Sequence, residues 1–444
     1  MSEWTRKTIA QCAADEPYST QIGPFGKALT PQEYTSSGVP LLRGVNVNSG
    51  RFYDDGFVFI SEETADRLSK FESFPGDVLL VHKGTLGQIG LMPKNRKFDR
   101  YIMGNSMLRV KCDPEKLLPE YLYYWLSSSE GQHYLFSRVS QVGVPQIQQP
   151  LTTLRQASLP VPPLYEQKAI TNILGSLDDK IELNRQMNET LEAMARAIFK
   201  DWFIDFGPTR AKMAGRPPYL PGQVWSLFPD TIDEETGLPQ GWNVGNILEF
   251  ADLLSGGTPK TSEPSYWDGD IDWVSAKDVK NANGSFLLET EKKITQTGID
   301  KSSTKLLPPK TTIITARGTV GEHRILGRPM TMNQTNYGLK AKDHFGDYFI
   351  YFMLKNLIEE LRQQSYGTIF DTITTKTFLN TTCTKPSKMM VQKFEDQVVP
   401  FMDTVLCNQV ISSTLAELRD RLLPRLMSGE IRVKEAEKMV EEVM

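Results

Sequence analysis

An internal repeat constrains the fold of this chain more than any other feature, because a duplicated sequence predicts two copies of one structural unit. Three segments of the first half recur in the same order in the second: 39–47 as 271–279, 75–87 as 309–321, and 120–125 as 347–352. The first two pairs are interpreted as strands that enter polar or glycine turns, and the third as the start of an aromatic-rich helix. Matches in one order at nearly constant spacing indicate duplication.

Each copy runs into a long helical pattern in which apolar residues recur every three or four positions, so one face of each helix should be dry. The residues of these stripes are Ile173, Leu177, Met187, Leu191, Met194 and Ile198 in the first helix and Phe394, Val398, Phe401, Val405, Leu415, Leu418 and Leu422 in the second. Asn184 and Asn408 interrupt the stripes at matching places, and such polar residues can fix helix register. Two stripes in one chain favour an antiparallel helix pair; alternatively, each helix buries its stripe in its own domain.

The predicted fold class is α+β: two repeated α/β domains joined by two long helices packed as an antiparallel coiled coil. The predicted segments are domain 1 at 1–160, a helix at 161–206, a proline-rich connector at 207–240, domain 2 at 241–385, a second helix at 386–432 and a charged tail at 433–444. The connector is too rich in proline for a continuous helix. The tail is expected to fray.

Composition limits the functional classes. With 444 residues and 39% hydrophobic residues, the chain can bury the cores of two or three domains. Its net charge of -4 gives no overall sign of polyanion binding, so a nucleic-acid role must rest on local patches. The four cysteines show no CxxC spacing, which fits a reducing cytoplasm. No stretch reaches the ~20 apolar residues needed to cross a bilayer, so no membrane role is expected.

Signatures of catalysis on nucleic acids are missing from the sequence. It contains neither a GxxxxGK[ST] phosphate loop nor the Asn/Asp-Pro-Pro-aromatic motif of amino-methyltransferases, and its four histidines form no metal-binding pattern. A non-catalytic binding protein is therefore predicted. Two alternatives remain open: a single-chain nuclease or methyltransferase with an unfamiliar site, and a two-lobed scaffold that does not bind DNA.

The repeats share features suited to DNA contact. In both Lys83-Gly-Thr85 and Arg317-Gly-Thr319, a cation precedes a glycine turn that could approach a phosphate, although a purely structural turn also explains the glycines. Amides and cations in neighbouring loops could read bases. The candidate DNA contacts are Arg43, Asn46, Lys83, Gly84, Thr85, Asn105 and Gln146 in the first copy, and Ser275, Lys277, Arg317, Gly318, Thr319, Asn333 and Gln334 in the second.

Several of these motifs together resemble the specificity subunits of type I restriction-modification systems. The motifs are Leu238-Pro-Gln-Gly-Trp242, Ser255-Gly-Gly-Thr-Pro259, the run 266–274, Arg317-Gly-Thr-Val-Gly321 and, at the first helix entry, Val161-Pro-Pro-Leu-Tyr-Glu-Gln167. The resemblance covers essentially the whole chain. It departs in the first copy, where the stretch from Leu29 to Gly38 matches the Ser255–Pro259 motif poorly, and at 385–394, which lacks the Glu-Gln pair.

The resemblance implies two target-recognition domains, each reading one half of a split site in double-stranded DNA, with the helices setting the spacer and docking modification subunits. It also implies two modification subunits that use S-adenosylmethionine and two restriction subunits that use ATP and magnesium. This chain is expected to bind none of these cofactors.

Overall fold

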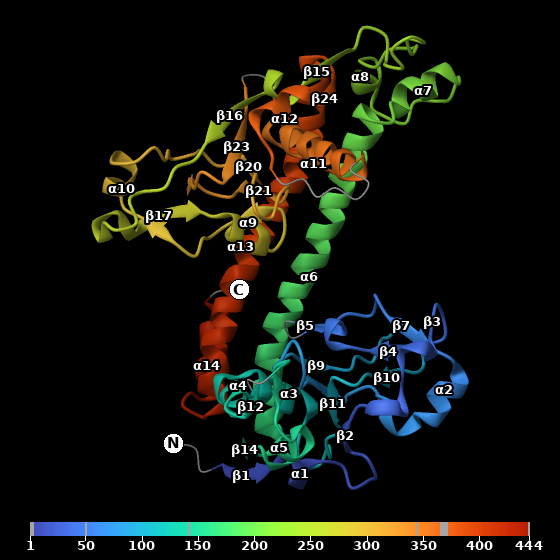
Figure 1. Cartoon of the computed structure of the whole chain (residues 1–444), viewed down its shortest axis with the longest axis vertical. Coiled ribbons are helices and arrows are strands. Elements are labelled where there is room, and N and C mark those ends of the chain that lie inside the picture. Colours follow the sequence, from blue (N-terminus) through green and yellow to red (C-terminus); the bar gives the residue numbers. More distant parts are fainter. Residues whose placement is uncertain (1–3, 49–50, 141–142, 343–344, 365–371, 443–444) are drawn as a thin grey trace. The chain divides into compact units, whose positions relative to one another are not determined.

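A computed structural model describes residues 4–48, 51–140, 143–342, 345–364 and 372–442 (Figure 1). The chain divides into two compact units, Met1–Lys180 with Thr414–Met444, and Ile181–Ser413. We call them unit 1 and unit 2 and describe each by itself. The division falls inside both long helices, so each unit holds one globular domain and one segment of each helix.

Unit 1 contains two four-stranded sheets. The first has the order β2-β11-β8-β9, with β2 at Thr20–Ile22, β11 at Met107–Val110, β8 at Val78–Val81 and β9 at Ile89–Leu91. The second has the order β10-β4-β7-β3, with β10 at Ile102–Met103, β4 at Val39–Leu42, β7 at Val58–Ile60 and β3 at Tyr34–Thr35. The apolar run of β8 is buried throughout, as a continuous hydrophobic strand should be.

Unit 2 also contains two sheets, with a different number of strands in each. Its five-stranded sheet has the order β16-β23-β20-β21-β18, with β16 at Ala251–Ser255, β23 at Asn336–Ala341, β20 at Thr312–Thr315, β21 at His323–Leu326 and β18 at Phe286–Leu287. Its second sheet has the order β19-β17-β22, with β19 at Lys293–Ile294, β17 at Trp267–Val274 and β22 at Thr331–Met332.

The pairing register confirms the internal repeat. Val81 opposes Met107 in unit 1, and Thr315 opposes Asn336 in unit 2. The parallel pairs also match, because Met103 lies opposite Leu42 and Met332 lies opposite Val274. The α+β class is thereby confirmed, with two copies of one domain.

In each domain, the first strand pairs with the last strand before the long helix begins. In unit 1, β1 (Thr5–Thr8) pairs antiparallel with β14 (Ser158–Val161), and in unit 2, β15 (Asn243–Asn246) pairs likewise with β24 (Thr382–Lys385). Shorter helices complete the domains: α1 (Ile9–Cys12), α2 (Glu62–Arg67), α3 (Pro119–Ser127), α4 (Ser129–Phe136) and α5 (Pro150–Gln156) in the first, and α9 (Ala276–Asn281), α10 (Gln296–Asp300), α11 (Asp347–Gln364) and α12 (Thr375–Asn380) in the second.

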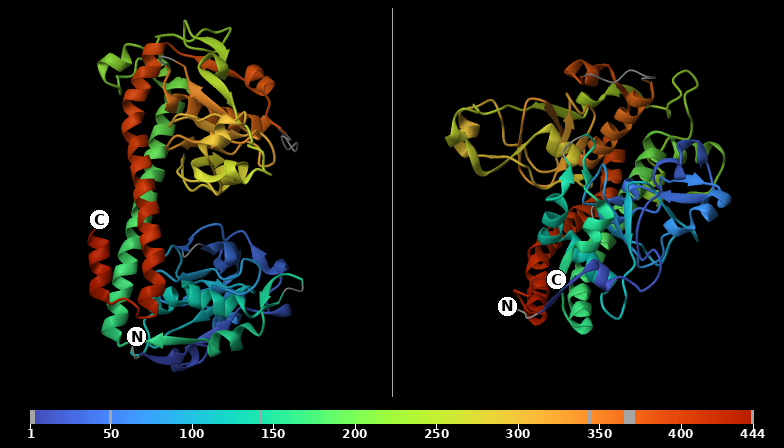
Figure 2. Two further views of the ribbon diagram at one scale, coloured as in Figure 1. Left: turned by 90° about the vertical axis from the view of Figure 1, so that its left-hand side faces the viewer. Right: turned by 60° about the horizontal axis from the view of Figure 1, so that its bottom comes forward.

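The two long helices are α6, Leu164–Phe203, and α13, Lys388–Met427, of 40 residues each. Within each unit their segments lie side by side (Figure 2). In unit 2, Asn184 Nδ2 donates to Ser412 Oγ at 3.2 Å, and Asn408 Nδ2 donates to Asn188 Oδ1 at 2.9 Å. As the number of the α6 residue rises, that of its α13 partner falls, so these segments run antiparallel.

Most of the residues expected in the apolar stripes face inward. Buried positions are Ile173, Leu177, Asn184, Phe394, Val398, Val405, Asn408, Leu415 and Leu422, and partly buried ones are Leu191 and Ile198. The prediction was wrong for Met187 and Met194, which are 42% and 45% exposed. Asn188 and Ala195 face inward instead. Because successive helical residues are about 100° apart, Met187 and Met194, one residue earlier, lie at the exposed edge of the stripe.

The connector and the tail contain short helices. α7 (Gly207–Met213) and α8 (Gly222–Trp225) lie between proline-containing segments of the connector. The C-terminal tail does not simply fray as expected, because Val433–Glu441 forms α14, which buries Ala436 and Val440. Its apolar residues recur at helical spacing among charged ones, which makes it amphipathic. No helix within the described residues has the length and apolar character that crossing a membrane requires.

A buried carboxyl in unit 2 predicts a pH-dependent stability. Glu395 of α13 accepts the N–H of Phe349, at the start of α11, at 2.6 Å. Burial raises the pKa of Glu395 to about 7 from an ordinary value of 4.5, despite that hydrogen bond. A carboxyl with a raised folded-state pKa costs stability as pH rises from the unfolded pKa to the folded one.

We therefore expect Glu395→Gln to raise Tm by roughly 2–4 °C at pH 8. The difference should shrink towards pH 5, because both side chains are then neutral. Thermal unfolding across pH 5–8 measures it, with the exposed neighbour change Asp396→Asn as control. If Glu395→Gln lowered Tm by the same amount at pH 5 and at pH 8, this expectation would be wrong.

Candidate nucleic-acid interface

The ends of several strands meet at one edge of the first domain. Gly104 N donates to Leu42 O at 2.7 Å, and His82 N donates to Ser106 O at 2.9 Å. The loops that follow β4, β8 and β10 are therefore held together by backbone hydrogen bonds. We call this surface, formed by residues 23–26, 43–46, 82–87, 104–106 and 143–147, the first reading edge.

The glycine turn of this edge is anchored on both sides. Gly84 N donates to Pro145 O at 3.1 Å, and Ile147 N donates to His82 O at 2.9 Å. Gly84 has a φ of 86°, and a Cβ added there would meet only open space. The backbone conformation alone explains the glycine. Evidence for DNA contact must therefore come from the neighbouring side chains.

Several predicted side chains are free to reach a ligand from this edge. Lys83, Thr85, Asn105 and Gln146 are exposed. Arg43 is half-buried and donates to Gly56 O at 3.0 Å, so its guanidinium is partly committed to the fold. The edge thus offers a cation, a hydroxyl and two amides.

The prediction that Asn46 reads a base was wrong. Asn46 is 1% exposed, and its Nδ2 donates to Tyr53 O at 3.2 Å and to Asp55 O at 2.8 Å. Its Oδ1 accepts the N–H of Arg43 at 3.0 Å. The amide shapes the loop and has no face left for DNA.

The second domain builds its edge with equivalent hydrogen bonds. Asn333 N donates to Val274 O at 2.9 Å, Ala316 N donates to Thr335 O at 2.8 Å, and Ile373 N donates to Ala316 O at 2.9 Å. Gly318 has a φ of 80°, as Gly84 does within a few degrees. We call residues 256–259, 275–277, 316–321, 333–335 and 372–373 the second reading edge.

The predicted residues of the second edge divide into two groups. Arg317, Gly318 and Gln334 are exposed. Asn333 is committed locally, since its Oδ1 accepts the hydroxyl of Thr335 at 2.7 Å. The prediction that Thr319 contacts DNA through its hydroxyl was wrong, because that oxygen is buried.

Two further candidates in this edge have structural partners. Ser275 caps α9, with its Oγ accepting the N–H of Asp278 at 3.3 Å. Lys277 Nζ lies 2.6 Å from Glu291 Oε2, and this carboxylate raises the pKa of the lysine. Lys277 therefore stays cationic, but a DNA phosphate would have to compete with Glu291 for it.

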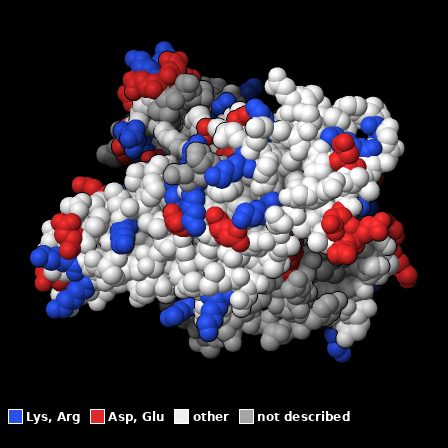
Figure 3. Space-filling model, turned by 90° about the horizontal axis from the view of Figure 1, so that it is seen from above, with Lys and Arg blue, Asp and Glu red and all other residues white. Residues whose placement is uncertain are grey.

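Each edge carries two cations, Arg43 and Lys83 in the first and Lys277 and Arg317 in the second. Lys277 is paired with Glu291, whereas Lys83 and Arg317 have no ion-pair partner among the described residues. Burial lowers the pKa of His82, and it lowers that of His323 to about 4, so these histidines are neutral at physiological pH. Elsewhere, acidic and basic side chains are interspersed, as on the face in Figure 3. Within the described residues, no cluster of three or more His, Cys, Asp or Glu could hold a metal.

Comparison with known proteins decides the family. The family model of the type I restriction modification DNA specificity domain matches the chain twice, at residues 26–193 and 239–399. The chain belongs to this family. It is a specificity subunit with two target-recognition domains, and such subunits are the non-catalytic components of restriction-modification complexes.

Relatives align over nearly the whole chain. The type I restriction enzyme HindI specificity subunit of Haemophilus influenzae is 27% identical, over 86% of this chain and 94% of the relative. The MjaIX specificity subunit of Methanocaldococcus jannaschii is 26% identical, over 97% and 93%. The crystal structure of a type I restriction-modification S subunit from M. genitalium shares the fold, with a TM-score of 0.57, 18% identity and coverage of 96% of both chains.

Sequence reasoning missed one segment of the first reading edge. The Ser255–Pro259 motif was compared with the stretch from Leu29 to Gly38, yet its structural counterpart is 22–26. A Cβ on Gly23 would lie 1.9 Å from Gly104 O, and one on Gly256 would lie 2.1 Å from Asn333 O. Segments 22–26 and 255–259 share only the glycine at their second position, so the two sequences could not be aligned by residue identity.

Substituting two asparagines separates folding from recognition. Asn46→Ala should cost about 1–3 kcal/mol of stability, because it removes the donor to the Tyr53 and Asp55 carbonyls and the acceptor of the Arg43 N–H. Asn105→Ala should leave Tm unchanged and weaken binding to the recognised DNA about tenfold. Thermal unfolding and fluorescence anisotropy of the assembled complex measure these effects. If Asn105→Ala lowered Tm but left the DNA affinity unchanged, Asn105 would not belong to the DNA interface.

Proposed function

We propose that each target-recognition domain reads one half of a bipartite site in double-stranded DNA. The duplicated reading edges are the observation that carries this proposal. Their backbones match, whereas Lys83 corresponds to Arg317 and Asn105 corresponds to Gln334. Two such edges present different donors and acceptors, so they would select different sequences.

Within each edge we assign different contacts to different side chains. Lys83 and Arg317 would neutralise phosphates, which positions the protein without reading sequence. Asn105, Gln146 and Gln334 would read base edges, because an amide can bond adenine through two hydrogen bonds. Arg43 is a weaker candidate, since it already bonds Gly56.

We propose that α6 and α13 form an antiparallel coiled coil that sets the spacer between the half-sites. At about 1.5 Å per residue, a helix of 40 residues is about 60 Å long. Asn184, Asn188, Asn408 and Ser412 form a polar layer whose hydrogen bonds favour one register of the two helices. A fixed register would give a fixed spacer.

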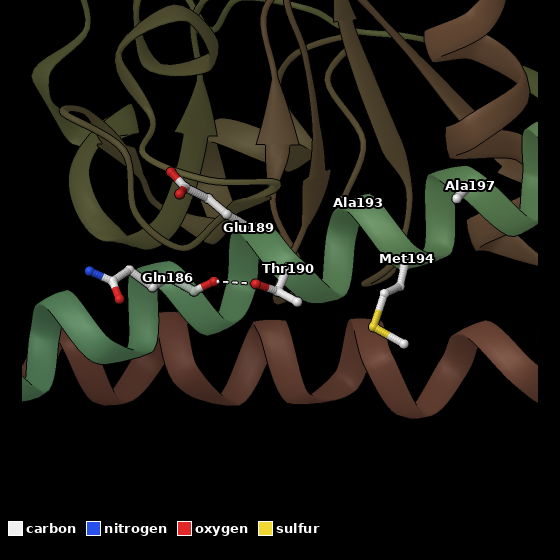
Figure 4. Close-up of a pocket in the computed structure, with 6 residues that line it drawn as sticks. All are labelled: Gln186, Glu189, Thr190, Ala193, Met194 and Ala197. Atoms are coloured by element: carbon white, nitrogen blue, oxygen red, sulfur yellow. Dashed lines mark hydrogen bonds between the residues drawn. The ribbon is translucent and has the colours of Figure 1, made fainter. Parts of the chain in front are cut away.

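We propose an uncharged face of the helix pair in unit 2 as the docking surface for a modification subunit. On α6, Glu192 and Arg196 turn towards the domain, and Arg196 pairs with Glu359. On the opposite side of α6, the exposed residues at helical spacing are uncharged: Leu183, Met187, Thr190, Met194 and Ala197. An exposed, uncharged row at the same spacing occurs on α13: Pro400, Thr404, Cys407 and Ile411. A shallow groove along α6 borders this face and shares Thr190, Met194 and Ala197 with it, and it is also lined by Gln186, Ala193 and one carboxylate, Glu189 (Figure 4). Contiguous uncharged surface of this kind is typical of a protein interface.

The complete assembly that we propose contains two modification subunits and two restriction subunits. The modification subunits would use S-adenosylmethionine, and the restriction subunits ATP and magnesium, while this chain supplies recognition. We place the assembly in the cytoplasm, where host DNA is accessible and thiols such as Cys407 stay reduced.

Half-site reading can be tested with two matched substitutions. Asn105→Ala should relax the sequence requirement at one position of one half-site, and Gln334→Ala at one position of the other half. Sequencing of modified bases in host DNA, with and without each variant, measures both halves at once. Variants that both relax the same half, or neither half, would contradict the assignment.

Docking can be tested with one added charge. Met194→Glu should weaken co-purification of the modification subunit at least about tenfold, because a carboxylate would be desolvated in the interface. Tm should stay unchanged, since Met194 is half exposed. Gln223→Glu, at an exposed position of α8, places the same charge elsewhere and should have no effect. Normal assembly of the Met194→Glu chain would exclude this face.

A further inference from the structure

Exposed apolar side chains at the first reading edge have no structural role that explains their exposure. Phe25 is 56% exposed, Val45 64% and Val144 57%. The ring centroid of Phe25 lies 6.4 Å from that of His82, the residue before Lys83. A large, half-exposed aromatic ring thus stands next to the turn that begins at His82 and carries Lys83.

Close backbone packing fixes the position of this ring. Gly23 lies against Gly104 O, where a Cβ would be 1.9 Å from the oxygen. No other residue type fits there without moving the loop. Phe25 follows two residues later, so it is held next to the loop that carries Asn105.

The second domain shows what a side chain at this position does. Gly256 packs against Asn333 O as Gly23 packs against Gly104 O, and Thr258 follows two residues later, as Phe25 does. The Thr258 hydroxyl donates to Gln334 Oε1, and Gln334 is the counterpart of Asn105. In the second domain this position therefore adjoins the amide proposed to read a base, and the matching backbone of the first domain holds Phe25 near the loop of Asn105.

We propose that Phe25 is a specificity-determining residue that recognises thymine through its 5-methyl group in the major groove. The proposal rests on the proposed function. Among the groups that base pairs present in the major groove, the thymine methyl is apolar, and side chains such as Phe read it by contact. Covering that methyl and the exposed ring removes apolar surface from water, which is favourable. The polar Thr258 gives the second domain a different preference at the same place.

Replacing thymine by uracil tests this contact, because uracil lacks only the methyl group. The assembled complex is titrated with duplexes that carry the recognised site, with deoxyuridine replacing each thymidine of one half-site in turn. For the unaltered chain, one position should lose affinity about fourfold, as expected for one buried methyl. Phe25→Ala should bind the thymine duplex more weakly and show no uracil effect there, whereas Phe25→Leu should keep part of it.

The controls separate this proposal from the proposed function. Thr258→Ala should leave the uracil effect unchanged, because it alters the other domain. If bipartite recognition is observed but no thymine position responds to uracil, or Phe25→Ala keeps the full response, the Phe25 proposal is wrong and the proposed function stands. Weaker binding of Phe25→Ala without a uracil effect in the parent chain would instead indicate a wedge between base steps, and would also overturn it. Absence of any bipartite site would remove the proposed function itself.

Discussion

The burial of one helical stripe against another is the interaction on which both units depend. Unit 1 holds the first part of α6 and the last part of α13, and unit 2 holds the remainder of each. In unit 1, Asp178 of α6 accepts the hydroxyl of Tyr124 at 2.7 Å and pairs with Arg419 of α13 at 2.7 Å, so one carboxylate links the domain to both helices. In unit 2, rings of both helices and α11 pack together. Each domain therefore attaches to a support that neither helix provides alone.

Duplication explains why the polar layer has two similar hydrogen bonds. When two copies of one helix pack antiparallel, a local two-fold relation makes each contact occur twice. Asn184 and Asn408 occupy matching places in the copies, and so do Asn188 and Ser412. The bonds from Asn184 to Ser412 and from Asn408 to Asn188 are the two versions of that one contact. A shifted register would bury these amides without partners, at a cost of about 1–3 kcal/mol each.

The sequence predicted features that depend on local pattern. Collinear motifs revealed the repeat, helical spacing revealed α6 and α13, and the glycine turns lie where expected.

The sequence did not reveal features that depend on packing between residues from different segments. Asn46 looked like a base reader, but carbonyls seven and nine residues away bind its amide. Met187 and Met194 lie only one residue from the positions that face inward. The charged tail forms α14 because Ala436 and Val440 are buried on one face of that helix. The Gly23 loop can be aligned with the Gly256 loop only from the structure, where each glycine packs against an equivalent backbone carbonyl.

Recognition can change in such a fold without disturbing it. The bonds that hold each reading edge together run between backbone groups, such as Gly104 N to Leu42 O and Asn333 N to Val274 O. These bonds need no particular side chain, and the close approaches need glycine, as at Gly23 and Gly256. The exposed positions between them carry little structural constraint, so Asn105 could diverge from Gln334 and Phe25 from Thr258 after duplication. One backbone framework therefore supports two different recognition surfaces in the same polypeptide.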